Sequence, residues 1–270
     1  MKTKGSVENY YDAVANNYDN LFKDSISQAE NLIVKDWIIQ IIKESGKKMK
    51  ICDLGCGTGL CLELITKDLD ETEYEYTGID ISSEMINEAK RKFKNKRNAS
   101  FIQCDIAEMK LLFENNSFDM VVSLFGSYSH VPKYKEGLRR ISQVLKPGGK
   151  LFLMVYSKYS FRSIFDYVFR QRKKALGFER QYNIRNNKKN ISCKALFYSP
   201  CIVRMVLEKT NFKRIKCRGL NFFFELGFLK TVLKQFNVGF VRRILEKESC
   251  LFGNRAQFAH SLIVFAEKNN

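Results

Sequence analysis

The sequence predicts an α/β fold in which helices cover both faces of a mainly parallel sheet, and three observations lead to this prediction. Apolar, strand-like runs alternate with amphipathic, helix-like runs, which is the pattern of a parallel sheet with crossover helices. A glycine-rich stretch, DLGCGTG at residues 53–59, joins a strand-like run to an amphipathic one. The 270 residues, 45% of them hydrophobic, suffice for one buried core, so we expect a single domain over residues 1–270.

The elements follow from this alternation in chain order. Two amphipathic segments, at about residues 7–20 and 26–44, precede the sheet and form an expected helical N-terminal cap over residues 1–46. Ser199 is the expected N-cap of the last helix, with Pro200 at its first position. Seven strands are expected at about residues 48–54, 74–79, 100–104, 119–125, 150–156, 212–218 and 260–266. The helices between them should cover residues 59–69, 83–94, 133–145 and 201–210.

Two segments are longer than ordinary connections and should be insertions with structure of their own. Residues 158–195 form an expected basic lid, and residues 221–258 form an expected helical insertion. The remainder divides into a half that contains the glycine turn, residues 47–157, and a part that completes the sheet, residues 196–270. The two insertions are the expected lid and specificity elements.

The net charge of +17 is concentrated in one part of the chain. Residues 1–150 contain 22 basic and 22 acidic side chains, whereas residues 151–270 contain 24 basic and 7 acidic ones. Any anionic partner should therefore meet the second part, although a solvated basic face without a partner would have the same composition. The cations of the expected lid include Arg170, Arg172, Lys173, Lys174, Arg180, Arg185, Lys188 and Lys189.

Cysteine and histidine usage argues against a metal centre. The eight cysteines include no CxxC pair, and the chain has two histidines, so neither a zinc site nor a disulfide framework is expected. The N-terminal stretch lacks the apolar core of a signal peptide, and no run approaches the ~18 apolar residues of a membrane span. We therefore expect a cytoplasmic protein with reduced thiols.

Three carboxylates are expected around the glycine turn. Asp53 lies near the end of the first strand, Asp80 ends the second in TGID, and Asp105 follows the third in QCDI. Because the carboxyl ends of parallel strands meet at one edge of a sheet, these side chains should line one crevice. They would repel a pyrophosphate, and the turn is not followed by the Lys and Ser/Thr of a P-loop. A ligand with cationic groups and a ribose fits better.

S-adenosylmethionine is such a ligand, and the sequence resembles the class I S-adenosylmethionine-dependent methyltransferases. The resemblance implies a Rossmann-like, seven-stranded, mainly parallel sheet, S-adenosylmethionine as cofactor, S-adenosylhomocysteine as its product, and no metal. The matching pieces stand in the family's order and spacing: DLGCGTG at 53–59, GID at 78–80, CDI at 104–106, FDMVVS at 118–123 and LKPGGKL at 145–151.

The resemblance also implies which residues hold the cofactor. Asp53 and the turn of Gly55, Gly57 and Gly59 would hold the methionine portion, and Asp80 would accept hydrogen bonds from both ribose hydroxyls. Each carboxylate alone could be an ordinary strand-end or capping residue, but the set of three favours the cofactor.

The adenine side of the site is implied in the same way. Ile81 would pack on the adenine, and Asp105 with the Ile106 backbone would read its edge. The further cofactor-binding positions that the resemblance implies are Cys56, Thr58, Met85 and Leu124.

Two tyrosines near the N-terminus are candidates for the active site. Residues 11–19 match the Y-D-x-x-A-x-x-Y-D opening of many small-molecule methyltransferases, in which tyrosines close over cofactor and substrate. Tyr11 and Tyr18 are seven residues apart and should share a helix face. The alternative is a stripe that simply faces the core.

The segment after the fourth strand should line the position of methyl transfer. It reads SLFGSYSHV at residues 123–131 and is similar to the same segment of small-molecule N- and O-methyltransferases, amino-sugar N-methyltransferases among them. His130 would then be a base or orienting group beside the methyl, and the alternative is a structural histidine. Nucleic acid is an unlikely substrate, because the chain's three prolines form no Pro-Pro-aromatic motif of the base N-methyltransferases.

These observations predict a methyltransferase that modifies an O or N atom of a small metabolite, either neutral or anionic, such as a sugar, a nucleotide-linked sugar or a natural-product intermediate. Two alternatives stay open. A membrane-associated lipid or quinone methyltransferase is suggested by residues 220–245, where aromatic side chains alternate with Lys and Arg. A catalytically silent protein that only binds S-adenosylmethionine would keep the same glycine turn. The acceptor and the oligomeric state are not predicted.

Overall fold

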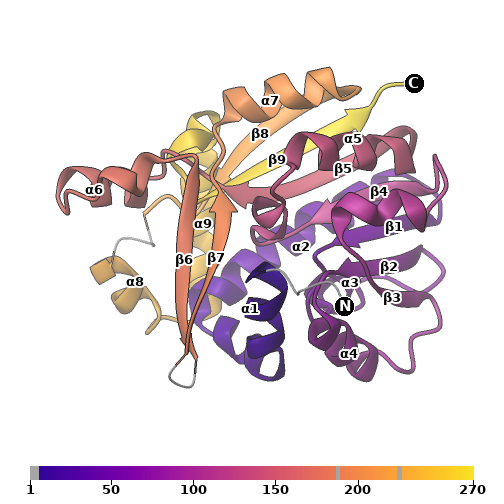
Figure 1. The fold of residues 1–270 in the computed structure, drawn as a ribbon, viewed down its shortest axis with the longest axis horizontal. Coiled ribbons are helices and arrows are strands. Elements are labelled where there is room, and N and C mark those ends of the chain that lie inside the picture. Colours follow the sequence, from indigo (N-terminus) through magenta and orange to yellow (C-terminus); the bar gives the residue numbers. More distant parts are fainter. Residues whose placement is uncertain (1–5, 187–188, 224–226) are drawn as a thin grey trace.

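The computed structural model describes residues 6–186, 189–223 and 227–270, which form a central sheet with helices on both faces (Figure 1). Within these residues the sheet has seven strands, each at a predicted place. Their bounds are β1 Met49–Leu54, β2 Tyr74–Asp80, β3 Ala99–Gln103, β4 Phe118–Ser123, β5 Leu145–Tyr156, β8 Phe212–Leu220 and β9 Ser261–Lys268.

The strand order places the ends of the parallel strands at one edge. The order is β3-β2-β1-β4-β5-β9-β8, and β9 is antiparallel to both of its neighbours, β5 and β8. The first five strands are parallel. The chain moves from β1 outward to β3 and then returns to the other side of β1 as β4. Ligands bind at such a switch point, beyond the carboxyl ends of the strands, and the predicted Rossmann-like fold is confirmed.

Helices cover both faces of the sheet and bury two apolar cores. In the described part of the chain, four helices contribute most of the helix side chains packed on one face, with Leu233 of a further helix beside them, and two helices pack on the other. The first group is α2 Ser25–Glu44, α3 Leu60–Ile65, α4 Ser83–Lys92 and α9 Val238–Phe252. The second is α5 Tyr134–Val144 and α7 Pro200–Lys209. The remaining helical segments are α1 Ser6–Val14, η1 Ala15–Phe22, η2 Ile106–Leu111, η3 Ser127–His130, α6 Phe161–Val168, η4 Lys173–Leu176, α8 Gly227–Leu233 and η5 Gly253–Phe258, where η marks a 3₁₀ helix.

Local sequence signals explain where several helices begin and end. The Ser199 hydroxyl accepts a hydrogen bond from the Ile202 amide, and Pro200 stands in the first turn of α7, as predicted. The predicted helix at 59–69 is shorter, since α3 ends at Ile65. The predicted amphipathic segment at 7–20 is helical in two parts, α1 followed by the tighter η1.

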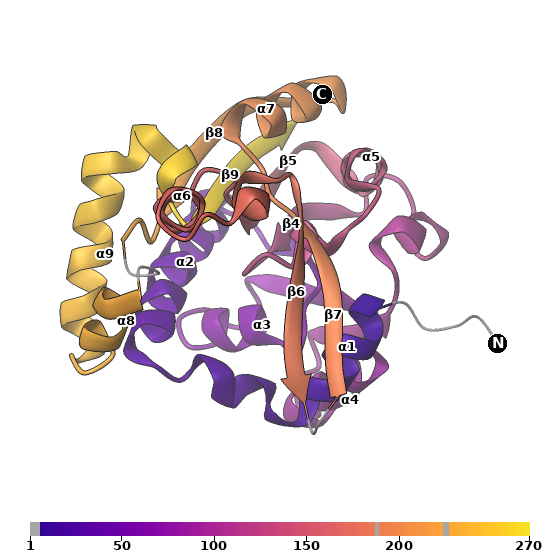
Figure 2. The same ribbon diagram turned by 60° about the vertical axis from the view of Figure 1, so that its left-hand side comes forward.

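The segment 158–195 contains α6, η4 and a hairpin of two antiparallel strands, β6 Glu179–Asn186 and β7 Lys189–Leu196. The sequence analysis placed no strand there. The hairpin stands apart from the seven-stranded sheet and lies against α1 (Figures 1 and 2). This contact joins the lid to the N-terminal segment.

Helix α9 covers the last part, residues 238–245, of the segment in which aromatic and basic side chains alternate. It packs along α2, and Val241 and Leu245 are fully buried in the core. This part of residues 220–245 is therefore a packed helix over the sheet, while residues 224–226 lie outside the described part. Among the described helices, none has the length and apolarity needed to cross a bilayer.

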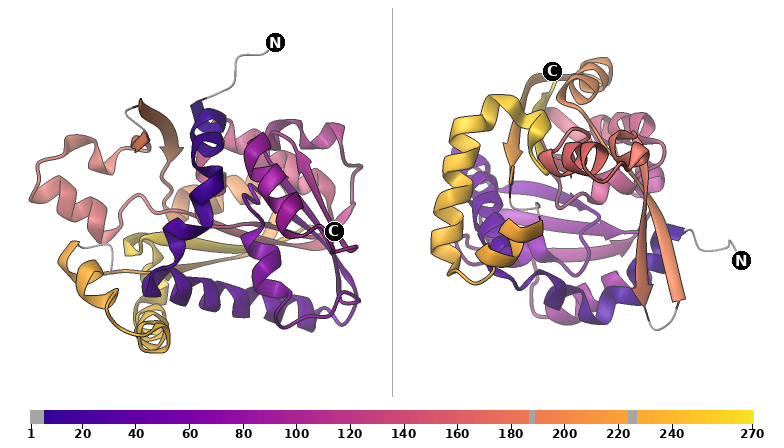
Figure 3. Two further views of the ribbon diagram at one scale, coloured as in Figure 1. Left: turned by 90° about the horizontal axis from the view of Figure 1, so that it is seen from below. Right: turned by 90° about the vertical axis from the view of Figure 1, so that its left-hand side faces the viewer.

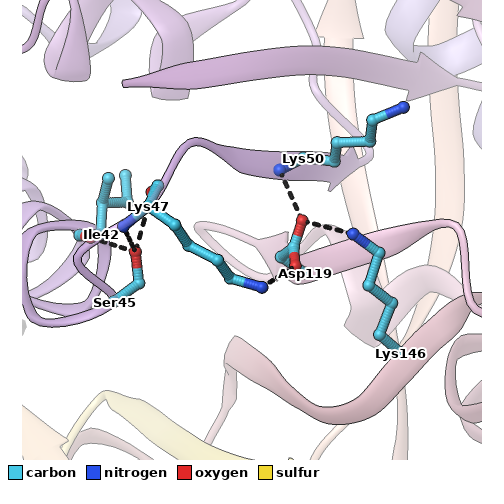
Figure 4. Close-up of polar contacts among 6 residues, drawn as sticks. All are labelled: Ile42, Ser45, Lys47, Lys50, Asp119 and Lys146. Atoms are coloured by element: carbon cyan, nitrogen blue, oxygen red, sulfur yellow. Dashed lines mark hydrogen bonds and ion pairs between the residues drawn. The ribbon is translucent and has the colours of Figure 1, made fainter. Parts of the chain in front are cut away.

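A buried carboxylate connects neighbouring segments at the amino ends of the parallel strands, opposite the glycine turn (Figure 4). Asp119 at the start of β4 accepts hydrogen bonds from Lys47 Nζ at 2.7 Å, Lys146 Nζ at 2.9 Å and the Lys50 amide at 3.0 Å. Burial alone would raise the pKa of Asp119, but these donors lower it below its ordinary value. Lys146 belongs to the KPGG stretch, which therefore has a structural contact at this edge.

Candidate functional site

A cavity of about 280 Å³ lies at the carboxyl edge of the parallel strands, beneath α1 and η1. It brings together nine of the residues singled out from the sequence: Tyr11, Tyr18, Gly55, Gly57, Asp80, Ile81, Asp105, Ile106 and His130. Val7, Glu8, Cys104, Ser127, Val131 and Pro132 complete its lining. Ser127 and Val131 belong to the segment 123–131 that was expected to line the site, whereas Val7, Glu8 and Pro132 were not predicted.

The glycine turn lines the cavity next to the end of β1, and its backbone conformation requires glycine. Gly55, Gly57 and Gly59 have φ angles of +69°, +54° and +90°, in the left-handed region that other residues rarely adopt. A Cβ at Gly55 would lie 2.5 Å from that of Ser127. A Cβ at Gly59 would lie 2.5 Å from the Phe93 ring, so this glycine serves the packing of the turn and does not line the cavity.

Asp80 at the end of β2 forms hydrogen bonds with two loops, the glycine turn after β1 and the loop after β2. Its carboxylate accepts hydrogen bonds from the Gly57 and Ser82 amides, both at 2.9 Å. Burial raises its pKa despite these bonds. Because each carboxylate oxygen has two lone pairs, both oxygens can accept a further hydrogen bond from a ligand.

Asp53, one residue before the end of β1, is buried beneath the turn. Its Oδ2 accepts a hydrogen bond of 2.6 Å from the Tyr76 hydroxyl, whereas its Oδ1 has no hydrogen-bond partner among the described residues. Burial raises the pKa of Asp53 to about 7, against the effect of the Tyr76 hydrogen bond, and the nearby charge of Asp80 raises it further. An unpartnered buried carboxylate oxygen is costly and favours a ligand that brings a donor or a positive charge.

The other predicted cofactor positions lie at or behind the cavity wall. Asp105 caps η2 by accepting a hydrogen bond of 2.9 Å from the Ala107 amide and also lines the cavity. Four further side chains are buried and do not line the cavity; they support the turn and its neighbouring strands from within the protein. They are Cys56, Thr58, Met85 and Leu124.

The two aspartates of the Y-D-x-x-A-x-x-Y-D stretch attach the N-terminal segment to the cofactor loops. Asp12 accepts a hydrogen bond of 2.6 Å from the hydroxyl of Ser82, which follows β2. Asp19 accepts one of 2.5 Å from the hydroxyl of Thr58 in the glycine turn. Lys92 on α4 also donates to Asp19, at 3.0 Å. These aspartates were missed in the sequence analysis, although they alternate with the tyrosines that were named.

Tyr11 and Tyr18 face the cavity from α1 and η1. Their ring centroids are 6.2 Å apart, so the two rings share one face although the helix changes from α to 3₁₀ between them. Burial raises the pKa of both phenols, which therefore remain protonated. They are neutral hydrogen-bond donors over the cavity.

His130 ends η3 and is held between two aromatic rings and the hairpin. Its ring is edge-on to Tyr11 at 5.7 Å and to Tyr156 at 6.0 Å between centroids. Its Nδ1 lies 3.0 Å from the main-chain carbonyl oxygen of Lys194 on β7. A carbonyl can only accept, so the hydrogen bond requires the proton on Nδ1 and leaves the lone pair on Nε2. Burial lowers the pKa of His130, more than the carbonyl raises it.

The residues present fit S-adenosylmethionine, the cofactor that the sequence resemblance implies. The Asp80 and Asp105 carboxylates line the cavity and suit hydroxyl and amino donors. Asp53, which the sequence analysis placed in the same crevice, is buried behind the glycine turn and does not line the cavity, and its unpartnered oxygen suits a donor or cation that reaches the turn. A Cβ at Gly57 would extend to within 3.8 Å of Tyr18, so the glycine keeps the space beneath that tyrosine open. Among the described residues, no three His, Cys, Asp or Glu side chains form a metal-ligand group.

The chain is similar to several known proteins. A family model described as a methyltransferase domain matches residues 51–149. The uncharacterised protein MJ1252 of Methanocaldococcus jannaschii is 30% identical over 258 residues, which cover 90% of this chain and 92% of that protein. The demethylmenaquinone methyltransferase of Staphylococcus aureus is 34% identical over 157 residues, which cover 57% of this chain and 62% of that enzyme.

A solved structure supports the fold. Phosphoethanolamine N-methyltransferase 2 of Haemonchus contortus, in complex with S-adenosyl-L-methionine, superposes with a TM-score of 0.53 and 20% identity, over 83% of this chain and 49% of that chain. The strand order, the glycine turn and the carboxylates at the strand ends agree with these matches. The chain therefore belongs to the class I S-adenosylmethionine-dependent methyltransferases.

Proposed function

We propose that this methyltransferase modifies an oxygen or nitrogen atom of a small acceptor and that His130 is its general base. The observation that carries the proposal is the contact between His130 Nδ1 and the Lys194 carbonyl oxygen, 3.0 Å long. It keeps the proton on Nδ1, while the lowered pKa keeps the ring neutral at physiological pH. Nε2 is then free to accept the proton that a hydroxyl or ammonium acceptor must lose.

The rest of the cavity supports the same proposal. When bound, S-adenosylmethionine supplies an activated methyl group on a sulfonium. We assign Asp53 and the glycine turn to its methionine portion, Asp80 to its ribose, and Ile81, Asp105 and Ile106 to its adenine. Tyr11 and Tyr18 cover the cavity, exclude water from it and donate hydrogen bonds to cofactor or acceptor.

A second cleft supports an acceptor that carries a carboxylate or phosphate. It measures about 850 Å³ and lies between α6, η4 and the hairpin, where Arg172, Lys173, Lys174 and Lys194 line it. Lys194 links it to the first cavity, since its main chain contacts His130. Arg180 lines the cleft too, but it donates to Ser163 Oγ and the Lys158 carbonyl, both at 2.7 Å. Lys188 lies outside the described residues, as do the side chains of Arg185 and Lys189.

The proposed base is tested by His130→Ala. We expect kcat to fall roughly 100-fold, the usual loss when a general base is removed, while the cofactor Kd changes little. In the wild type kcat should rise with pH and level off, with an apparent pKa below the ordinary histidine value, and this rise should vanish in the variant. A kcat that is unchanged by the substitution, on an acceptor whose chemistry limits the rate, would return His130 to a structural role.

The acceptor class is tested by following a deuterated methyl group from the cofactor into products by mass spectrometry. Phosphorylated and carboxylated hydroxy or amino metabolites form the first panel. Demethylmenaquinone in detergent is the second candidate, favoured by the 34% identity to the Staphylococcus aureus enzyme. Labelling of the quinone alone would replace the small anionic acceptor by the membrane-associated alternative, and labelling of neither panel would contradict both.

A further inference from the structure

Helix α6 and the turn after it carry a row of apolar side chains, an apolar stripe, that extends from the core into solvent. Phe161, at the start of the stripe, stacks on Phe223 and Phe258 at 4.8 and 5.5 Å between ring centroids. The stripe continues outward through Phe165, which is 38% exposed, and Val168, which is 55% exposed. The helix projects from the body in Figure 1 and in the left-hand view of Figure 3. Its far end therefore adds nothing to the core.

The most exposed large side chain of this stripe is Phe169, of which 72% is accessible, and Tyr167 beside it is 46% exposed. The Phe169 ring packs on Phe165, with ring centroids 4.9 Å apart. Exposed aromatic side chains of this size are unfavourable in water, and a contiguous group of them marks an interaction surface.

Basic side chains accompany this stripe along the same segment. Asp166 is the acidic residue of the segment Phe161–Leu176, and it forms ion pairs with Arg162, Arg170 and Arg172 at 3.2, 3.1 and 3.8 Å. With the exposed Lys173 and Lys174, the segment carries five basic side chains and one acidic side chain. The ion pairs hold three guanidinium groups beside the apolar stripe. The segment thus combines exposed apolar side chains with a net positive charge.

We propose that the segment Phe161–Leu176 docks this enzyme onto an anionic lipid bilayer. Phe165, Val168 and Phe169 enter the boundary between headgroups and acyl chains, and the arginines and lysines contact the lipid phosphates. Apolar side chains combined with basic ones are what a peripheral helix needs for such binding. Nucleic acid would meet the cations but would leave Val168 and Phe169 exposed. The proposal does not depend on which acceptor is methylated.

The docking surface is also close in sequence to the proposed acceptor cleft. The 3₁₀ helix η4 leads through Gly177 and Phe178 into β6 of the hairpin, and Arg172, Lys173 and Lys174 belong to both the surface and the cleft. Docking would therefore bring the mouth of the cleft near the lipid headgroups. Binding through a short apolar stripe and several charges is expected to be reversible.

The test is sedimentation of the full chain with vesicles of phosphatidylcholine alone and of phosphatidylcholine with phosphatidylglycerol. We expect binding to the anionic vesicles and little to the neutral ones. The double substitution Val168→Ser with Phe169→Ser, and separately Lys173→Glu with Lys174→Glu, should each reduce the vesicle partition coefficient by roughly tenfold or more. All four side chains are exposed, so the fold should be kept, and circular dichroism checks this.

Matched controls come from the other part of the molecule. Leu111→Ser with Leu112→Ser removes two exposed apolar side chains at the end of η2. Lys90→Glu with Lys94→Glu makes the same charge change near α4. Both should leave vesicle binding unchanged. A Phe169→Trp variant should be quenched by brominated acyl chains, which reports insertion directly.

Three results would overturn the proposal. One is the absence of binding to anionic vesicles, and another is binding that the Val168 and Phe169 substitutions leave intact. The third is a dimer in solution that these substitutions dissociate, since the stripe would then be covered by a second copy of the chain. None of these readouts uses enzyme activity, so they are independent of the proposed base and acceptor.

Discussion

At the residue scale, the buried carboxyl of Asp53 links cofactor binding to pH. Burial raises its pKa to about 7, so in the cofactor-free protein this carboxyl is partly protonated near neutral pH. The proposed ammonium partner would favour the ionised form and lower this pKa. We therefore predict that cofactor binding releases a proton and that affinity rises between about pH 6 and pH 8.

Calorimetry in buffers of different ionisation enthalpy measures this proton. Asp53→Asn should abolish the release and flatten the pH dependence of Kd, because the amide cannot ionise. Asp70→Asn, which changes an exposed carboxylate away from the cavity, should keep both. An affinity for the wild type that is the same at pH 6 and pH 8 would argue against an ammonium beside Asp53.

At the element scale, α1 and η1 are attached to the cofactor loops by two hydrogen bonds. Asp12 accepts from Ser82, and Asp19 accepts from Thr58. Neither segment belongs to the sheet: α1 packs against the hairpin and α4, and Ala15 is a buried side chain of η1. The segment is thus expected to open and close over the cavity more readily than the sheet unfolds.

We predict that replacing both Asp12 and Asp19 by alanine accelerates dissociation of the cofactor and raises its Kd by about tenfold. A net contribution of about 0.7 kcal/mol for each of the two hydrogen bonds, within the usual range, sums to about 1.4 kcal/mol, which corresponds to tenfold. Stopped-flow fluorescence gives the dissociation rate, and the thermal midpoint should change little. Asn16→Ala, at an exposed position of η1, is the matched control. Unchanged dissociation in the double variant would show that the two contacts do not close the site.

At the scale of the whole molecule, we assign different roles to the carboxyl ends and the amino ends of the parallel strands. The carboxyl edge holds the cavity, and the opposite edge holds Asp119 with Lys47, Lys50 and Lys146 (Figure 4). The ion pairs at Asp119 connect the starts of β1 and β4 with the KPGG stretch. We assign this group to stability and not to chemistry.

Asp119→Asn should therefore lower the free energy of unfolding by about 2 kcal/mol, the usual value of hydrogen bonds to a buried charge, with little effect on cofactor affinity. The folded pKa of Asp119 lies below its unfolded value, so this stabilisation is complete above about pH 4 and is lost as the pH falls below it. Chemical denaturation at pH 7 and at about pH 3 checks the sign. A difference between wild type and variant that persists unchanged in acid would refute the assignment.

The strands of the sheet and the loops that follow β1 and β2 could be predicted from the sequence alone. Alternation of apolar runs is a local property, and the carboxyl ends of parallel strands must meet at one edge. For that reason Gly55, Gly57, Asp80 and Asp105 could be assigned to one crevice before any coordinates. The hairpin could have been found in the same way, since residues 179–196 contain two alternating runs around a polar stretch.

Only the tertiary structure decided how the two insertions and the N-terminal segment complete the site. The proton position on His130 depends on the carbonyl of Lys194, 64 residues away, and the partners of Asp12 and Asp19 lie 70 and 39 residues away. The exposure of Phe169 likewise depends on how far α6 projects from the core. Such contacts are set by packing between distant segments, and a periodic pattern along the chain carries no information about which loops will meet.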